Sequence, residues 1–226
     1  MNEEIRTIYP IAHIYNDFKD KFGLPKQSGL APHLMSRIVM TPKFRVAEAF
    51  RGIEDYDRLW LLWLFDDDGK GFSPTVRPPM LGGNERMGVF ATRSPNRPNH
   101  IGMTNVELIS YEWDPKDGPV ITVAGADIRS GTAIIDIKPY ISAADCQPVL
   151  RNGFTSRAKQ TPLTVAFDTI IPREIDENSI TALKEVLSLD PRPRYQDDPS
   201  RIYGMDYGDY NIKFKVDGNR IIVLSF

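Results

Sequence analysis

The sequence has few of the residues that build disulfides, metal sites or membrane spans. Cys146 is the single cysteine among 226 residues, so an internal disulfide and a zinc site made of several cysteines are excluded. The three histidines show no metal-ligand spacing, and we expect no metal. The longest apolar run, residues 59–65, is far too short to cross a bilayer. Because the first ten residues lack the apolar core of a signal peptide, we expect a cytoplasmic protein with no membrane partner.

The chain also lacks an excess of positive charge. It has 28 basic and 30 acidic residues, a formal net charge of -2. Proteins that hold nucleic acid through their overall charge are usually basic, so any RNA contact must come from a local patch. No G-x-G-x-x-G follows a predicted strand, which argues against a Rossmann-type nucleotide site.

The first two thirds of the chain is predicted to form short β-strands joined by loops rich in proline and glycine. A short helix is predicted at residues 46–53. The strand candidates are residues 8–14, 34–40, 59–65, 87–91, 106–113, 120–124 and 134–140. Parallel strands would need crossover helices, for which these connections leave no room. We therefore predict a mainly β protein built on an antiparallel β-barrel.

The last third has a different pattern. Apolar residues recur at helical spacing in residues 179–189, with Asp176 or Asn178 available as the N-cap. Residues 210–226 are predicted to form a β-hairpin that turns at 217–219. We predict a barrel domain over residues 1–145 and a small α+β appendage over residues 146–226.

Arginines gather between residues 77 and 97. Arg77, Arg86, Arg93 and Arg97 stand against the single acid Glu85, a local charge of +3. Guanidinium groups match the geometry of carboxylates and phosphates, so the segment is a candidate anion site. A solvated loop with scattered surface arginines would explain the same composition.

Two further features could hold a ligand. Residues 94–102 (SPNRPNHIG) contain two prolines and a glycine, which favour a stiff loop after a strand. Asp66, Asp67 and Asp68 follow the apolar run and repel one another, so at least one is expected to have a partner. They could bind a metal, accept hydrogen bonds from ribose hydroxyls, or lie solvated at a turn.

The central block of the sequence resembles the TrmO/TsaA family. The resemblance rests on RPPMLGGNERMGVFATRSPNRPNHIGMTNVEL (77–108), with LPKQSGL (24–30), IIDIKPY (134–140) and DPRPRY (190–195) in the same order. It implies a β-barrel that binds S-adenosylmethionine beside a homodimer interface. It also implies methylation of N6 of threonylcarbamoyl-adenosine at position 37 of tRNA.

The resemblance implies a set of cofactor-binding residues. Acidic side chains suit an amino group or ribose hydroxyls, an arginine suits the methionine carboxylate, and glycine lets the backbone approach a ligand. The implied residues are Ser28, Gly29, Leu30, Asp66, Asp67, Arg93, Ser130, Gly131, Thr132 and Ala133. Two positions depart from the family pattern: His100 replaces a proline, and Ser130, in the implied set, replaces an aspartate.

The acceptor nitrogen must lose a proton when it is methylated, so we expect a base or a hydrogen-bond acceptor. Asp136 is the candidate, and the alternative is that it is a structural carboxylate that points inward and pairs with Lys138 or an arginine. Arg86 or Arg97 would suit the carboxylate of the threonyl group.

The DPRPRY segment is predicted to contact RNA. Arg192 and Arg194 flank a proline that keeps the chain extended, and Tyr195 offers a face on which a base could stack. The alternative is a helix stop in which Tyr195 packs against the barrel and the arginines pair with Asp197 or Asp198.

Two other functions fit the same features. One is a β-barrel that binds tRNA or a nucleotide without chemistry, which would transfer no methyl group. The other is a methyltransferase for small molecules with the same cofactor pocket, whose activity would not depend on RNA.

Overall fold

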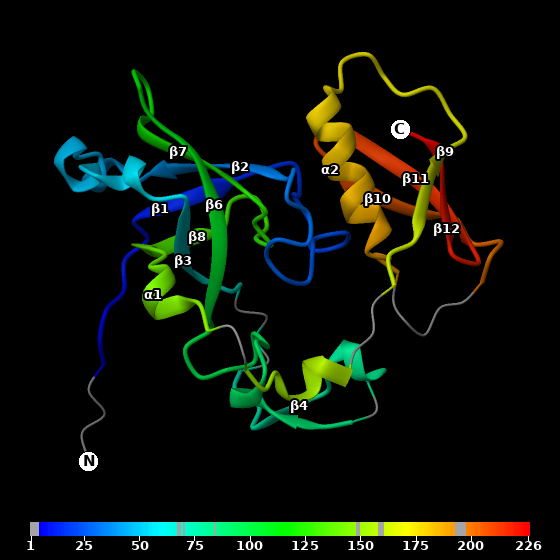
Figure 1. Ribbon diagram of the computed structural model, residues 1–226, viewed down its shortest axis with the longest axis horizontal. Helices are drawn as coiled ribbons and strands as arrows, with labels where there is room; N and C mark the ends of the chain where they lie inside the picture. Colours follow the sequence, from blue (N-terminus) through cyan, green and yellow to red (C-terminus); the bar gives the residue numbers. More distant parts are fainter. Residues whose placement is uncertain are drawn as a thin grey trace.

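Six antiparallel strands form a closed barrel in the computed structural model, which describes residues 5–66, 69, 71–83, 85–147, 150–157, 161–192 and 198–226 (Figure 1). Neighbours around the barrel follow the order β1-β2-β7-β6-β3-β8. The strands are β1 (Ala12–Tyr15), β2 (Met35–Met40), β3 (Arg58–Leu64), β6 (Ile101–Asp114), β7 (Gly118–Ala124) and β8 (Ala133–Pro139). The predicted fold class, a mainly β protein with an antiparallel barrel, is confirmed.

Alternating side chains explain how the barrel forms. In β3 every second residue is buried, namely Leu59, Leu61 and Trp63. Successive side chains of a strand point to opposite faces, so these three enter the barrel core. They pack there with apolar residues of the other strands, among them Ile14 and Ile134.

Short elements join the barrel strands. Residues 46–53 were expected to form a helix but form two 3-10 segments, because Gly52 adopts a left-handed φ of 84° between them. The strand expected at residues 87–91 ends at Gly88 and continues as a 3-10 turn, since it pairs only with the two-residue strand β4. The 3-10 segments are η1 (Pro42–Phe44), η2 (Ala47–Phe50), η3 (Ile53–Asp55), η4 (Pro79–Leu81), η5 (Val89–Ala91) and η6 (Gly153–Arg157). The other short elements are β4 (Thr75–Val76), β5 (Met87–Gly88) and α1 (Ser142–Asp145).

A second sheet with one covering helix lies beside the barrel (Figure 1). Its strands are β9 (Thr164–Phe167), β10 (Tyr203–Tyr207), β11 (Tyr210–Asp217) and β12 (Arg220–Ser225), in the order β10-β11-β12-β9. The predicted hairpin is β11 and β12. The predicted helix is α2 (Glu177–Ser188), where Asp176 accepts a hydrogen bond from the backbone N–H of Ser179 at 3.0 Å. α2 lies on the connection between β9 and β10, which are the two edge strands of this sheet, and β9 pairs parallel to β12.

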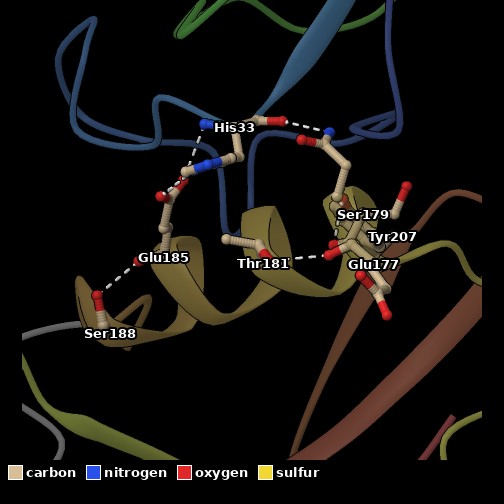
Figure 2. A network of polar contacts seen from close by, with 8 residues as sticks. His33, Glu177, Ser179, Thr181, Glu185, Ser188 and Tyr207 are labelled. Atoms are coloured by element: carbon tan, nitrogen blue, oxygen red, sulfur yellow. Dashed lines mark hydrogen bonds and ion pairs between the residues drawn. The ribbon is translucent and has the colours of Figure 1, made fainter.

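The loop after β1 joins the two units. Phe18, Ala31 and Leu34 are buried in the core of the second sheet and not in that of the barrel. His33, in the same loop, contacts Glu185 of α2 (Figure 2). The division into residues 1–145 and 146–226 therefore stays a prediction, with part of the first segment completing the core of the second.

Candidate functional site

A cavity of about 290 Å³ opens at one end of the barrel. The end of β3 and the start of β6 meet there, because Leu64 pairs with Ile101. We call it cavity A. It is lined by Pro25, Lys26, Gln27, Trp63, Phe65, Arg93, Arg97, Ile101, Gly102, Met103 and Asp127. An aromatic wall, two arginines and one carboxylate therefore face the same space.

Asp127 is the carboxylate of cavity A, and it ends a chain of hydrogen bonds. The indole N–H of Trp63 donates to Thr104 Oγ1 at 2.9 Å, and this hydroxyl donates to Asp127 Oδ1 at 2.7 Å. Burial raises the pKa of Asp127 above its usual value, although the bond from Thr104 and the charge of Arg93 act in the opposite direction. An acceptor held in place by burial and hydrogen bonds is suited to bind an ammonium group or hydroxyls.

Arg93 supplies the opposite charge in cavity A. Its Nη1 donates to Gln27 Oε1 at 2.8 Å, which ties the arginine loop to the loop that contains Lys26 and Gln27. The remaining donors of the guanidinium group can bind a carboxylate. The predicted cofactor-pocket position of Arg93 is consistent with this location.

The predicted Ser28–Leu30 loop supports the same cavity through its backbone. The N–H of Ser28 hydrogen-bonds to Asp127, and the N–H of Gly29 donates to Gly125 O at 2.9 Å. Gly29 has a φ of 77°, which glycine adopts at no steric cost. Leu30 is exposed. The loop therefore fixes Asp127 next to Arg93.

A neighbouring hollow of about 260 Å³ shares Trp63, Phe65 and Asp127 with cavity A. Asp66 lies there and contacts Arg129 at 2.9 Å and Lys21 at 3.3 Å. The Nε of Arg129 is buried and makes no hydrogen bond within the described part of the chain. Arg129 therefore carries an unsatisfied buried donor beside this hollow. Asp67, predicted to act with Asp66, lies outside the described residues.

The Ser130–Ala133 loop makes hydrogen bonds to the segment around β1 and contributes little surface to the cavities. Ser130 Oγ accepts from the N–H of Asn16 at 3.2 Å, and Gly131 N–H donates to Ile14 O at 2.7 Å. Ala133 pairs with His13 in the sheet. Thr132 is the member of this loop that lines the neighbouring hollow. Ser130, where the family has an aspartate, thus anchors the strand β1 to this loop.

Arg86 and Arg97 use part of their donors within the protein. Arg86 Nη1 donates to Thr75 Oγ1 at 2.8 Å. Arg97 Nη1 donates to the carbonyls of Thr92 and Ser94, each at 3.1 Å, and lines cavity A. His100 has a φ of 49°, which the ring of a proline forbids, so the departure from the family pattern changes the backbone here.

The structure places the other predicted residues away from cavity A. Asp136 lines a separate cavity of about 230 Å³ with residues such as Phe44 and Phe50, and contacts Lys138 at 2.7 Å. Arg192 pairs with Asp190 through two bonds, at 2.9 and 3.0 Å, and its side chain is only 11% exposed. Arg194 and Tyr195 lie outside the described residues.

The described residues hold no group of three or more metal-ligating side chains. In the same part of the chain, no helix has the length and apolar character needed to span a membrane.

Family models match nearly all of the chain. Residues 13–146 match the tRNA-methyltransferase O N-terminal domain, and residues 160–226 match the TrmO C-terminal domain. The chain belongs to the TrmO family. The resemblance of the central block is therefore confirmed.

Relatives within the TrmO family are similar over their whole length. The chain is 35% identical to the tRNA (adenine(37)-N6)-methyltransferase of Escherichia coli K12, with 91% of each chain covered. It is 35% identical to RcsF of Pseudomonas aeruginosa, named as a putative S-adenosylmethionine-dependent methyltransferase, over 91% of this chain and 90% of that one. The crystal structure of TrmO from Pseudomonas aeruginosa superposes with a TM-score of 0.80 and 29% identity, covering 98% of each chain.

Sequence reasoning missed Asp127, Gln27 and Trp63 as members of the cavity. A signal for Asp127 was present, because it comes three residues after the buried strand β7, and Asp66 comes two residues after β3. The contribution of Gln27 depends on a contact across 66 positions of the sequence, which no local pattern reveals.

Proposed function

We propose that this chain transfers the methyl group of S-adenosylmethionine to N6 of adenosine 37 in tRNA, and that the adenosine already carries an N6-threonylcarbamoyl group. Membership of the TrmO family and the names of relatives such as the Escherichia coli enzyme support the reaction. The threonylcarbamoyl group comes from the resemblance to the TrmO/TsaA family.

The observation that carries the cofactor assignment is the opposite charge of Arg93 and Asp127 in one aromatic-walled cavity. The methionine end of S-adenosylmethionine has a carboxylate and an ammonium group, which suit Arg93 and Asp127 respectively. Trp63 and Phe65, with ring centroids 4.2 Å apart, suit its adenine or its sulfonium. When bound, the cofactor supplies an activated methyl group.

The chain's own residues contribute mainly positioning. In-line placement of acceptor and donor accounts for a large part of the rate of such transfers. The ties from Gln27 to Arg93 and from Ser28 to Asp127 fix the cavity walls before a ligand arrives. Asp136 as the base for the N6 proton stays a prediction. For this role the Asp136 carboxylate must be released from its ion pair with Lys138, and the substrate must reach the separate cavity that Asp136 lines.

The other predicted cofactor and RNA contacts are proposals of the same kind. They assign Asp66 with Asp67 and the Ser130–Ala133 loop to the cofactor, and Arg86, Arg97, Arg194 and Tyr195 to RNA. Arg192, also predicted to contact RNA, is instead held by Asp190. We also propose that the protein is a homodimer. We propose that it acts on tRNA in the cytoplasm. Light scattering that finds a fully active monomer at micromolar concentration would reject the dimer.

One assay tests the function. Purified protein is incubated with S-adenosylmethionine labelled in its methyl group and with tRNA from cells that lack the protein, with or without prior threonylcarbamoylation. We expect label at N6 of adenosine 37 only in the threonylcarbamoylated tRNA. Donor binding without transfer would favour a binding module, and transfer without RNA would favour a methyltransferase for small molecules.

A further inference from the structure

A second cavity, which we call cavity B, adjoins cavity A. Its volume is about 310 Å³, and the two cavities share Lys26, Gln27 and Arg93 as a common wall. The remaining wall of cavity B includes Arg77, Pro79 and Phe154. The two cavities therefore adjoin at these three residues, and an acceptor in cavity B would lie next to a donor in cavity A.

Phe154 reaches cavity B from a distant part of the chain. It belongs to η6, whose Arg157 forms two bonds to Glu85, at 3.0 and 3.2 Å. These bonds clamp η6 on the loop that follows η4, and both segments lie at the bottom of Figure 1 near β4. The clamp holds a half-buried aromatic ring in the wall of the cavity.

Arg77 gives cavity B a positive charge. Its side chain is exposed, and within the described part of the chain it makes no hydrogen bond or ion pair. Arg86 and Arg97, in contrast, already donate to Thr75, Thr92 and Ser94. Among the four arginines of residues 77–97, Arg77 is therefore the one whose guanidinium donors are all available to a ligand.

We propose that cavity B binds the threonylcarbamoyl-adenine of tRNA, with Phe154 stacked on the base and Arg77 paired with the threonyl carboxylate. The inference rests on the proposed function and adds the acceptor site to it. Enzymes that modify a base take it out of its stack and hold it in a pocket. Cavity B supplies what that requires: an aromatic face, apolar walls of Pro79 and its neighbours, and a cation.

The pairing is tested with anticodon stem-loop RNAs that carry at position 37 threonylcarbamoyl-adenosine, its uncharged methyl ester, or adenosine. Binding is measured by fluorescence anisotropy in the presence of S-adenosylhomocysteine. The unsubstituted protein is expected to prefer the acid to the ester by about tenfold or more, the usual effect of a charge-assisted hydrogen bond. Arg77→Gln should abolish this preference and leave the affinity for S-adenosylhomocysteine unchanged. The control Arg220→Gln, at an exposed site in β12, should keep the preference.

Stacking is tested with Phe154→Ala and Phe154→Tyr. The alanine variant should weaken the binding of acid and ester equally, and the tyrosine variant should restore it. The inference is overturned if Arg77→Gln keeps the preference for the acid, or if the unsubstituted protein has none. Failure of the unsubstituted protein to methylate the threonylcarbamoylated tRNA would instead overturn the proposed function.

Discussion

His33 and Glu185 are joined by two hydrogen bonds, although 152 positions separate them in the sequence. The ring Nδ1 of His33 lies 2.6 Å from Glu185 Oε1, and its backbone N–H donates to Oε2 at 3.0 Å (Figure 2). Asn178, also in α2, donates to the carbonyl of His33 at 2.9 Å. The helix α2 thus binds both the backbone N–H and the carbonyl of His33. His33 lies three positions after the Ser28–Leu30 loop, which supports Asp127 in cavity A.

Replacing Glu185 should affect the cofactor site from a distance. In Glu185→Ala the loop loses two hydrogen bonds, so we expect the free energy of unfolding to fall by about 2 kcal/mol, because each such bond typically contributes about 1 kcal/mol. Donor affinity should fall by a few-fold with little change in kcat, because the loop that supports Asp127 is less ordered. Chemical denaturation and calorimetry measure the two effects. Glu174→Ala, at an exposed loop site, is the control, and equal donor affinity in both variants would contradict the coupling.

Arg93→Ala should weaken the binding of S-adenosylmethionine by about 1.5–3 kcal/mol, the scale of a hydrogen bond to a charged group. The variant also frees Gln27 from its bond at 2.8 Å. Arg93→Ala is therefore compared with Gln27→Ala, which removes the tie but keeps the charge. Calorimetry that finds unchanged affinity in folded Arg93→Ala would reject the assignment.

Asp127→Asn should raise the stability of the protein at neutral pH and weaken the binding of the methyl donor. Burial raises the pKa of Asp127 above the value of 3.8 for a free carboxyl, so folding favours its protonated form. The stability that the protonated carboxyl contributes is fully present below the pKa of the unfolded state. It is lost as the pH rises through the higher pKa of the folded state, where the buried carboxyl becomes charged. At neutral pH the asparagine variant should therefore have a higher melting temperature than the unsubstituted protein, and the difference should shrink as the pH approaches 4.

The same variant should bind the donor about tenfold less tightly or worse, since it lacks the charge for the ammonium group. Melting curves across this pH range, combined with calorimetry at neutral pH, check both effects. A melting temperature below that of the unsubstituted protein at neutral pH would mean that the carboxylate stabilises the fold.

The two arginines of the DPRPRY segment should behave differently. Arg192 is held by Asp190 and is almost covered, so Arg192→Ala should lower stability and leave the salt dependence of tRNA binding unchanged. Arg194→Ala should lower tRNA affinity and make its salt dependence shallower, by about one unit of the logarithmic slope for each phosphate that the side chain neutralises. Binding titrations at several salt concentrations measure this. An unchanged slope for Arg194→Ala would leave packing as the better explanation for the whole segment.

Local sequence patterns predicted most of the barrel strands, the β11–β12 hairpin and the helix α2, because each is set by neighbours in the chain. They did not predict β9 and β10. The alternation in β3 and the cap at Asp176 are visible within a few residues. The predicted strand at residues 87–91 was wrong after Gly88, because a strand also needs a partner of equal length and β4 provides only two residues.

The candidate site was predictable only where a motif carried it. Arg93 and the Ser28–Leu30 loop came from the resemblance, and both lie beside Asp127. Asp127 itself, and Phe154 in cavity B, gain their environment from loops that are distant in the sequence. Such proximity follows from barrel closure and from the Arg157–Glu85 clamp, which no local pattern encodes.

The indole of Trp63 has a consequence for spectroscopy. It lies in the wall of cavity A, is only 8% exposed, and would collide with any side chain added at Gly102, where a Cβ would lie 2.4 Å from the ring. Its two companions, Trp60 and Trp113, are outside that wall and could be replaced by phenylalanine. Trp63 would then be the single tryptophan of the protein, and its fluorescence would come from the wall of cavity A. Binding of a ligand in this cavity would therefore change the wavelength and the intensity of the tryptophan emission.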